Sequence, residues 1–237
     1  MKEYVLNITE KARDMSYKLF NIETETKDRL LLKMAEYIIK EKDFIISENE
    51  KDVSNAIKNK LNKSIIDRLT LNDKRLKEMS TSLKEIAELP DPINNIIKEW
   101  KRPNEMIIQK VRVPIGVVLV IYEARPNVTS DCIGLLLKSS NVAILRGGSD
   151  SQYSRMAIGK VLNRAVKDSG LDFQPFFIVD KTEREVVDLL LKETENIDLV
   201  IPRGGEALIR KVAKASSIPV IKHYKGVCHI FVDKEFD

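Results

Sequence analysis

The apolar pattern is strongest in the middle of the chain, where two short apolar runs are separated by a loop and a helix. Residues 117–121 (VVLVI) form a continuous, largely β-branched run, which is typical of a strand buried on both faces of a parallel sheet. A loop at 122–127 and a short apolar helix at 133–138 follow, and a second buried strand at 141–145 leads into the glycine turn 146–150. Because such crossovers are right-handed and join parallel strands, both loops should emerge at the carboxyl edge of the sheet, where these folds bind ligands.

The alternation of strands and helices continues towards the C-terminus. Further strands are predicted at Pro175–Val179, Ile197–Ile201, Ile218–Ile221 and Cys228–Val232. Helices are predicted at Ser151–Ser169, from a capping box at Thr182 and Glu185 through Leu191, and at Glu206–Ala215. This order predicts an α/β fold with a parallel sheet of about five or six strands flanked by helices.

The first part of the chain, residues 1–93, is predicted to be a helical cover over one face of the sheet. From Leu6 to about Leu89 the sequence is rich in lysine and glutamate, and apolar residues recur at intervals of three and four. These stripes are Leu30, Met34 and Ile38, and then Leu76, Met79, Leu83 and Ile86. We interpret them as core positions, and the charged faces between them as solvated.

A break and a hairpin separate this cover from the α/β core, which we expect at residues 114–237. Pro90-Asp91-Pro92 cannot continue a helix. Two extended segments, 96–100 and 106–113, flank a turn signal at 102–104, so residues 94–113 are predicted to form a hairpin. A hairpin edge must be covered or paired, which favours an oligomer.

Composition and charge exclude several classes of protein. The 237 residues are 43% hydrophobic and 32% charged, and the net charge is only +4. A nucleic-acid-binding protein usually shows a stronger and more segregated basic excess. The sequence has no apolar run long enough to span a membrane and no signal-peptide core, and it has only two cysteines, so we expect a cytoplasmic protein without disulfides.

Two arginine–glycine turns are the strongest candidates for ligand binding. Arg146-Gly147-Gly148-Ser149 and Arg203-Gly204-Gly205 each follow a predicted strand and precede a predicted helix. Glycines let a backbone approach a ligand, a helix N-terminus favours anions, and the arginine fork suits a phosphate. The alternative is a pair of plain strand-to-helix turns with surface arginines, and no GxGxxG fingerprint is present.

The loop before the first helix of the core holds further candidates. Arg125 can bind an acyl phosphate or a carboxylate through paired hydrogen bonds, or it can form a salt bridge to Glu123 or Asp131. Asn127 suits a helix N-cap.

Four segments in this order resemble one known family. They are PIGVVLVIYEARPNVT, AILRGGSDS, VIPRGG and HYKGVCHIFVD, and they resemble the γ-glutamyl phosphate reductases of the aldehyde dehydrogenase superfamily. The resemblance covers nearly the whole chain. Members of the family are considerably longer, and their nucleophilic cysteine lies in a later segment, so the resemblance is to the N-terminal, cofactor-binding half.

The resemblance implies roles for individual residues. The superfamily places a basic residue at Arg146 against the adenosine ribose, and Ser149 stands where NAD-dependent members carry a carboxylate, which favours NADP. The turn at 203–205 would face the cofactor diphosphate. Asn127 would donate its amide to the oxyanion, and Arg125 with Glu123 would contact the substrate.

The implied reaction is the NADPH-dependent reduction of L-glutamyl 5-phosphate to L-glutamate 5-semialdehyde with release of phosphate, in proline biosynthesis. The hairpin would pair with a neighbouring subunit in a homo-oligomer, and without the nucleophile this chain alone would be inactive. There are three alternatives to this function: another enzyme of the superfamily, a non-catalytic NADPH-binding module, or a purely structural fragment.

Neither cysteine fits the nucleophile. Cys132 lies in the apolar helix after the loop, so we expect it to be a small buried apolar residue. Cys228 with His223 and His229 lacks zinc-site spacing, so we expect no metal.

Overall fold

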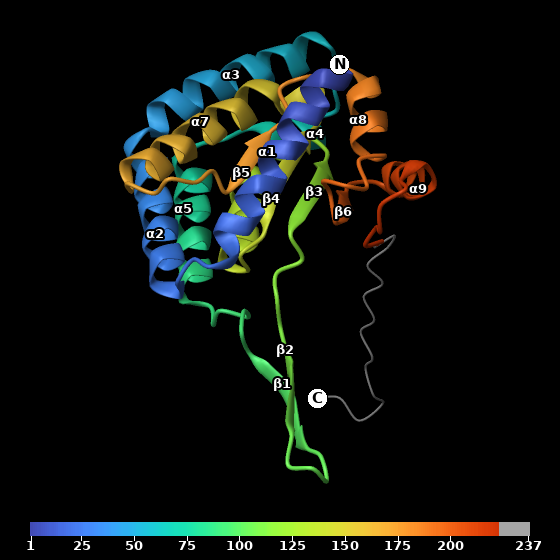
Figure 1. Cartoon of the computed structure of the whole chain (residues 1–237). Coiled ribbons are helices and arrows are strands. Elements are labelled where there is room, and N and C mark those ends of the chain that lie inside the picture. The colour runs from blue at the N-terminus through green and yellow to red at the C-terminus, as the bar shows by residue number, and fades with distance from the viewer. Residues whose placement is uncertain (223–237) are drawn as a thin grey trace, which may run out of the picture.

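A parallel sheet forms the centre of the computed structural model, which describes residues 1–222 (Figure 1). Its strands are β3 (Val117–Tyr122), β4 (Val142–Gly147), β5 (Phe176–Ile178) and β6 (Leu199–Arg203). They lie in the order β5-β4-β3-β6, and every neighbouring pair is parallel. All six residues of β3 are buried, as the continuous apolar run predicts for a central strand. The predicted α/β class is confirmed.

The edge beyond β6 differs from the sequence prediction. Within the described residues the predicted strand Ile218–Ile221 is reduced to an isolated parallel bridge between Val200 and Val220. Pro219 accepts a hydrogen bond from the Val200 N–H at 2.9 Å but has no N–H of its own, so it cannot extend the ladder. The predicted strand Cys228–Val232 lies outside the described residues.

The strand register brings three turns together at the carboxyl edge. Tyr122, the last residue of β3, pairs with Gly147 of β4 and with Arg203 of β6. The loop after β3 therefore lies between the two arginine–glycine turns, which are separated by more than fifty residues of sequence.

Helices cover the sheet in layers. After the first strand of the core come α6 (Asn127–Lys138), α7 (Gln152–Asp168), α8 (Arg184–Leu190) and α9 (Glu206–Ala215). Before the hairpin come α1 (Lys2–Phe20), α2 (Thr24–Lys40), α3 (Lys42–Lys58), α4 (Lys63–Leu69) and α5 (Asp73–Glu88). Helix α6 packs on β3 and β4 and against α7, whereas α1 contacts β3, β4, β5 and α8.

The N-terminal helices are only partly the predicted cover of the sheet. Helix α1 lies directly on the strands, but α2, α3 and α5 pack on α6 and α7 and so form an outer layer (Figure 1). A buried carboxylate joins this layer to the core, because Asp52 of α3 accepts hydrogen bonds from the backbone N–H groups of Tyr153 and Ser154 at 3.1 and 2.7 Å. It thereby caps the start of α7 from another helix.

A buried ion pair holds the end of the helical part beside the core. Lys27 of α2 is 1% exposed and pairs with Asp91, in the break before the hairpin, and it also donates to the hydroxyl of Ser140 at 2.9 Å. Thr24 donates to the same Asp91 carboxylate at 2.7 Å. The base of the hairpin is therefore fixed by charge as well as by packing.

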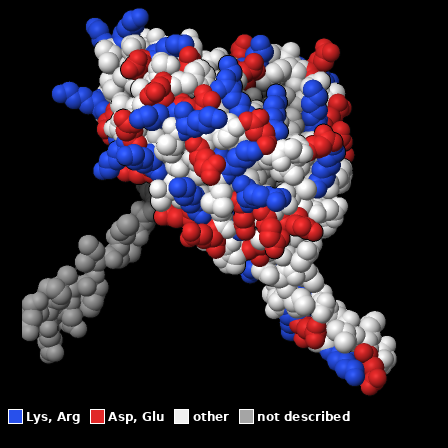
Figure 2. Space-filling model, turned by 90° about the vertical axis from the view of Figure 1, so that its left-hand side faces the viewer, with Lys and Arg blue, Asp and Glu red and all other residues white. Residues whose placement is uncertain are grey.

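The predicted hairpin is present and projects away from the body (Figures 1 and 2). Its antiparallel strands are β1 (Ile96–Lys101) and β2 (Ile107–Val111). Large apolar side chains are exposed along it, namely Ile96, Ile97, Trp100, Met106 and Ile107. The rest of the face in Figure 2 carries basic and acidic side chains interspersed.

Candidate functional site

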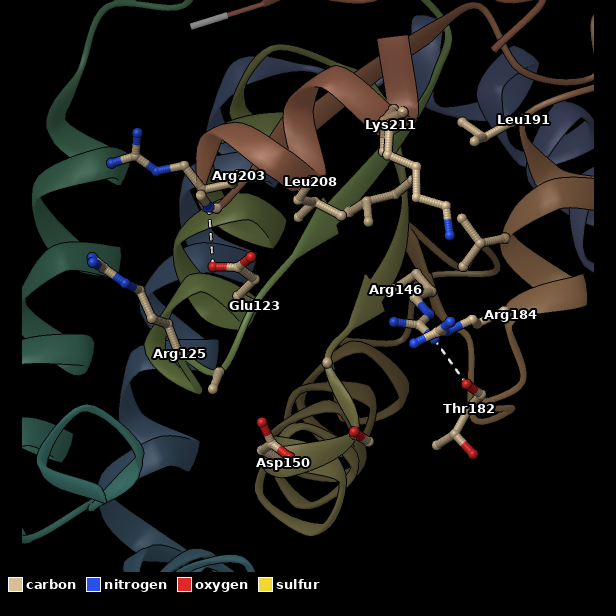
Figure 3. A pocket seen from close by; sticks show the side chains of 18 of the residues that line it. Glu123, Arg125, Arg146, Asp150, Thr182, Arg184, Leu191, Arg203, Leu208 and Lys211 are labelled. Atoms are coloured by element: carbon tan, nitrogen blue, oxygen red, sulfur yellow. Dashed lines mark hydrogen bonds between the residues drawn. The ribbon is translucent and has the colours of Figure 1, made fainter. Parts of the chain in front are cut away.

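The three turns at the carboxyl edge border a cavity of about 1170 Å³, which we call the first cavity (Figure 3). The loop after β3 contributes Glu123 and Arg125, the end of β4 contributes Arg146, and the end of β6 contributes Arg203. The two turns identified from the sequence therefore open into one space, as their position after parallel strands predicts.

The far wall of the first cavity is apolar and comes from α8 and α9. Its apolar side chains are Val187, Leu191, Leu208, Val212 and Ala215. The cavity thus has a charged end at the strand termini and an apolar end between two helices.

Basic side chains outnumber acidic ones around the first cavity. The basic residues are Arg68, Arg125, Arg146, Arg184, Arg203 and Lys211, and the acidic residues are Glu123, Asp150 and Asp188. This excess favours a negatively charged ligand. Sequence reasoning missed Arg68, Arg184 and Lys211. Of these, Arg184 is the first residue of the helix that follows β5, and a basic residue at a strand-to-helix connection is a signal that could have identified it.

Arg146 is the best-anchored cation of the cavity. Its Nη2 donates to the carbonyl oxygen of Thr182 at 2.9 Å, while its buried Nε has no hydrogen-bond partner among the described residues. Figure 3 shows Arg184 beside it, with both side chains near Thr182. The prediction that Thr182 caps a helix is wrong, because α8 begins at Arg184 and its N-cap residue is Glu183.

The two glycines after Arg146 differ in role. A Cβ on Gly147 would lie 3.0 Å from Cδ of Arg155 and 3.1 Å from the ring of Tyr122, so Gly147 makes room for these buried side chains. Arg155 is fully buried, and its Nη1 donates to the carbonyl oxygens of Gly147 and, at 2.9 Å, of Gly148. Gly148 lines the cavity, and a Cβ at this position would meet no atom closer than the Ala124 nitrogen, 3.6 Å away.

The helix N-termini behind both turns are already occupied by carboxylates. Residues Ser149–Ser151 form a 3₁₀ turn, so α7 begins only at Gln152, and Asp52 accepts its first N–H groups. At α9, Glu123 accepts the Gly205 N–H at 3.1 Å (Figure 3). The sequence predicted free N–H donors at both places; each carboxylate comes from a distant segment of the chain.

Asn127 lies in a second cavity of about 410 Å³, bordered by α4, α5 and α6. Its N-cap interpretation is wrong, because Pro126 is the N-cap residue and already has helical dihedral angles. The Asn127 amide instead donates to the Asp131 carboxylate at 3.2 Å. Arg125 lines both cavities and, among the described residues, forms no salt bridge, so the alternative pairing with Glu123 or Asp131 is not found.

Cys132 is half-buried one residue after Asp131. Burial, and after it the charge of Asp131, raises the pKa of the Cys132 thiol to about 12. The thiol is therefore protonated at neutral pH and is a poor nucleophile. The described residues contain no group of three or more potential metal ligands, and His223, Cys228 and His229 lie outside them.

No helix in residues 1–222 combines the length and apolar character that crossing a membrane requires. No family model matches the sequence.

Curated relatives match the chain from end to end. The γ-glutamyl phosphate reductase of Thermodesulfovibrio yellowstonii is 48% identical over 237 residues, which are 100% of this chain and 57% of that protein. The γ-glutamyl phosphate reductase of Sulfurihydrogenibium sp. is 47% identical over 236 residues, which are 53% of that protein. The chain spans about half the length of the curated relatives it matches.

Solved structures agree with this relationship. The crystal structure of γ-glutamyl phosphate reductase from Thermotoga maritima has a TM-score of 0.93 and 37% identity over 97% of this chain and 56% of that one. The enzyme from Saccharomyces cerevisiae gives 0.86 and 30% over 94% of this chain and 56% of that one. A probable aldehyde dehydrogenase from Listeria monocytogenes, at 0.71 and 15% over 92% and 45%, shows the shared fold. Over its whole length the chain is therefore homologous to about half of the length of the γ-glutamyl phosphate reductases, a family with the aldehyde dehydrogenase-like fold.

Proposed function

We propose that this chain is the NADP-binding part of an enzyme that reduces L-glutamyl 5-phosphate to L-glutamate 5-semialdehyde and releases phosphate, in the proline biosynthesis of the cytoplasm. The observation that carries the proposal is the first cavity, where basic side chains gather at the carboxyl edge and Arg68 and Arg125 lead on to the second cavity with Asn127. The division into a helical cover (1–93), a hairpin (94–113) and a cofactor-binding core (114–237) is part of this proposal.

The residues of the first cavity fit a nicotinamide dinucleotide. Its apolar wall between α8 and α9 suits an adenine ring, and the arginines of both turns suit the phosphates. The buried Nε of Arg146 has no partner within residues 1–222, so it can donate a hydrogen bond to a ribose hydroxyl or a phosphate oxygen. A structural neighbour, an engineered glycolyl-CoA reductase with bound NADP⁺, has a TM-score of 0.66 and 14% identity to this chain.

The preference for NADP over NAD rests on Arg146 and Ser149. A hydroxyl at position 149 does not repel a 2′-phosphate, and Arg146 has Arg184 beside it (Figure 3). Asp150 also lines the cavity but it follows the turn by one residue. Gly147, Gly148, Gly204 and Gly205 shape the two turns around the cofactor.

The bound NADPH would supply the hydride, and this chain would hold the substrate for it. Asn127 would donate its amide to the carbonyl oxygen of the acyl group, where negative charge develops. Arg125 lines both cavities and would bind the phosphate that leaves, and Glu123 would contact the ligand from the side of the first cavity. Burial keeps the Cys132 thiol protonated, so Cys132 does not fit the nucleophile. By resemblance to the family, the nucleophilic thiolate would come from a later segment of a longer chain.

A fluorescence titration of the 237-residue chain with NADPH, and in parallel with NADH, tests the cofactor assignment. We expect NADPH to bind at least about tenfold more tightly, and Arg146→Ala to remove most of this preference. Arg102→Ala, on the tip of the hairpin, is the matched control and should bind like the wild type. A folded chain that binds neither cofactor would overturn the assignment, and equal binding of both would overturn the NADP preference.

An activity assay separates the enzyme from a non-catalytic NADPH-binding module. The 237-residue chain alone should form no NADPH from L-glutamate 5-semialdehyde, phosphate and NADP⁺. A chimera that adds the part of the Thermotoga maritima enzyme not matched by this chain should form it. A folded chimera that binds NADPH without catalysis would favour the binding module.

A further inference from the structure

The second cavity contains charged groups that the fold does not use. It lies between α4, α5 and α6, and its polar lining consists of Asp67, Arg68, Arg75, Glu78, Ser82, Arg125, Asn127 and Asp131. Two of its carboxylates are paired, since Asp67 forms an ion pair with Arg75 and Glu78 forms one with Lys74. Arg68 and Arg125 line the first cavity as well, so the two spaces are neighbours that share a basic border.

Asp131 is a carboxylate without a cation. Its oxygens accept hydrogen bonds from the Ser82 hydroxyl at 3.3 Å and from the Asn127 amide at 3.2 Å. No lysine or arginine among the described residues forms an ion pair with it, although it is only partly exposed. Burial raises the pKa of the Asp131 carboxyl, and the two hydrogen bonds only partly offset this. A cation bound in the cavity would supply the missing partner.

Arg68 and Arg125 are cations without an acid. Neither guanidinium forms a hydrogen bond or ion pair among the described residues, whereas the nearby Arg75 donates to the Thr70 carbonyl at 2.6 Å and to Asp67 at 3.0 Å. Arg75 therefore stabilises the connection between α4 and α5, whereas the guanidinium groups of Arg68 and Arg125 remain available to a ligand.

We propose that the second cavity binds the amino-acid end of the substrate, with the α-ammonium group on Asp131 and the α-carboxylate on Arg68. One unpaired carboxylate and unpaired guanidinium groups in one cavity complement the opposite charges of an α-amino acid. Asn127 joins this end to the reacting carbonyl, because its amide lies against Asp131 on the same helix. The inference rests on the proposed function and adds the means by which the enzyme would select a glutamyl group over an acyl group without an amine.

Isothermal titration calorimetry with stable probes tests this assignment. L-glutamate carries the complete amino-acid end, and glutarate lacks only the amine. The wild-type chain should bind L-glutamate more tightly than glutarate. Asp131→Asn should weaken L-glutamate binding about tenfold or more and should not weaken glutarate binding. Arg68→Ala should weaken L-glutamate binding by a similar factor.

Glu85→Gln is the matched control, since it removes an exposed carboxylate of α5 that does not line the second cavity. NADPH titration of every variant reports whether the fold and the first cavity are intact. If the chain binds NADPH but not L-glutamate, or if Asp131→Asn binds L-glutamate like the wild type, the second-cavity proposal is wrong. If L-glutamate binds as expected and NADPH does not, the cofactor assignment alone fails.

Discussion

The carboxylate of Glu123 accepts the backbone N–H of Gly205 at 3.1 Å, across 82 residues of sequence. It therefore occupies the position at the start of α9 where the diphosphate of a dinucleotide would be bound. A cofactor that uses this helix N-terminus must displace the carboxylate.

Glu123→Gln should therefore tighten NADPH binding. Removing the negative charge from the start of α9 is worth about 1 kcal/mol for an exposed group, which corresponds to roughly a fivefold lower Kd. The fluorescence titration with NADPH measures it. Asp188→Asn removes another acidic charge from the same cavity without touching Gly205, and it should have a smaller effect. If both substitutions tightened NADPH binding equally, the gain would come from the lower negative charge of the cavity, and not from freeing the N-terminus of α9.

Gly147 and Gly148 provide a matched pair for stability. Gly147→Ala places a methyl group 3.0 Å from Cδ of the buried Arg155, and Gly148→Ala meets no atom closer than 3.6 Å. We expect Gly147→Ala to lower the free energy of unfolding by about 1–3 kcal/mol through overpacking, and Gly148→Ala to change it little. Urea unfolding measures both. A larger loss for Gly148→Ala would contradict the packing that we describe.

The architecture was predictable because it depends on local patterns. The buried run of β3 and the glycine turns after β4 and β6 identify the strands and place the turns on one edge. The start of α6 was not predictable in the same way. Asn127 is a good N-cap residue, but the fixed φ of Pro126 suits the first turn of a helix, so the helical dihedral angles begin one residue earlier.

The contacts that complete the site depend on residues far apart in sequence. Asp52 reaches the start of α7 from about a hundred residues away, and Glu123 reaches Gly205 from 82. A local pattern shows that a helix N-terminus attracts an anion but not which carboxylate reaches it first. For the same reason the sequence did not show that Arg68 and Asp131 share a cavity.

The hairpin should mediate association with a second copy of the chain. Ile97 and Ile107 are 52% and 62% exposed, and within residues 1–222 their strands pair only with each other, which is costly unless another surface covers them. Replacing both with lysine should give a monomer in sedimentation velocity with unchanged far-UV circular dichroism. Gln109→Lys, on the same hairpin, adds charge without removing an apolar side chain and should leave the mass unchanged. A wild-type chain that sediments as a monomer at high concentration would contradict the prediction.

The Lys27–Asp91 pair should make stability depend on pH. Burial raises the pKa of Asp91, but hydrogen bonds from Lys27, Ile93 and Thr24 outweigh this and lower the pKa overall. A carboxyl whose pKa is lower in the folded state stabilises the protein above its ordinary pKa, and this contribution is lost as the pH falls through the lowered value.

Asp91→Asn tests the sign of this dependence. At pH 7 it should lower the free energy of unfolding by about 3 kcal/mol, because it leaves the ammonium group of Lys27, which is 1% exposed, without its partner. The difference between wild type and variant should shrink as the pH falls towards 3, since a protonated Asp91 is as neutral as asparagine. Asp73→Asn breaks the exposed ion pair with Lys42 and should have a much smaller effect at every pH. Urea unfolding between pH 7 and about 3 measures this difference. If the difference in free energy of unfolding between wild type and Asp91→Asn grew on acidification, the lowered pKa of Asp91 would be wrong.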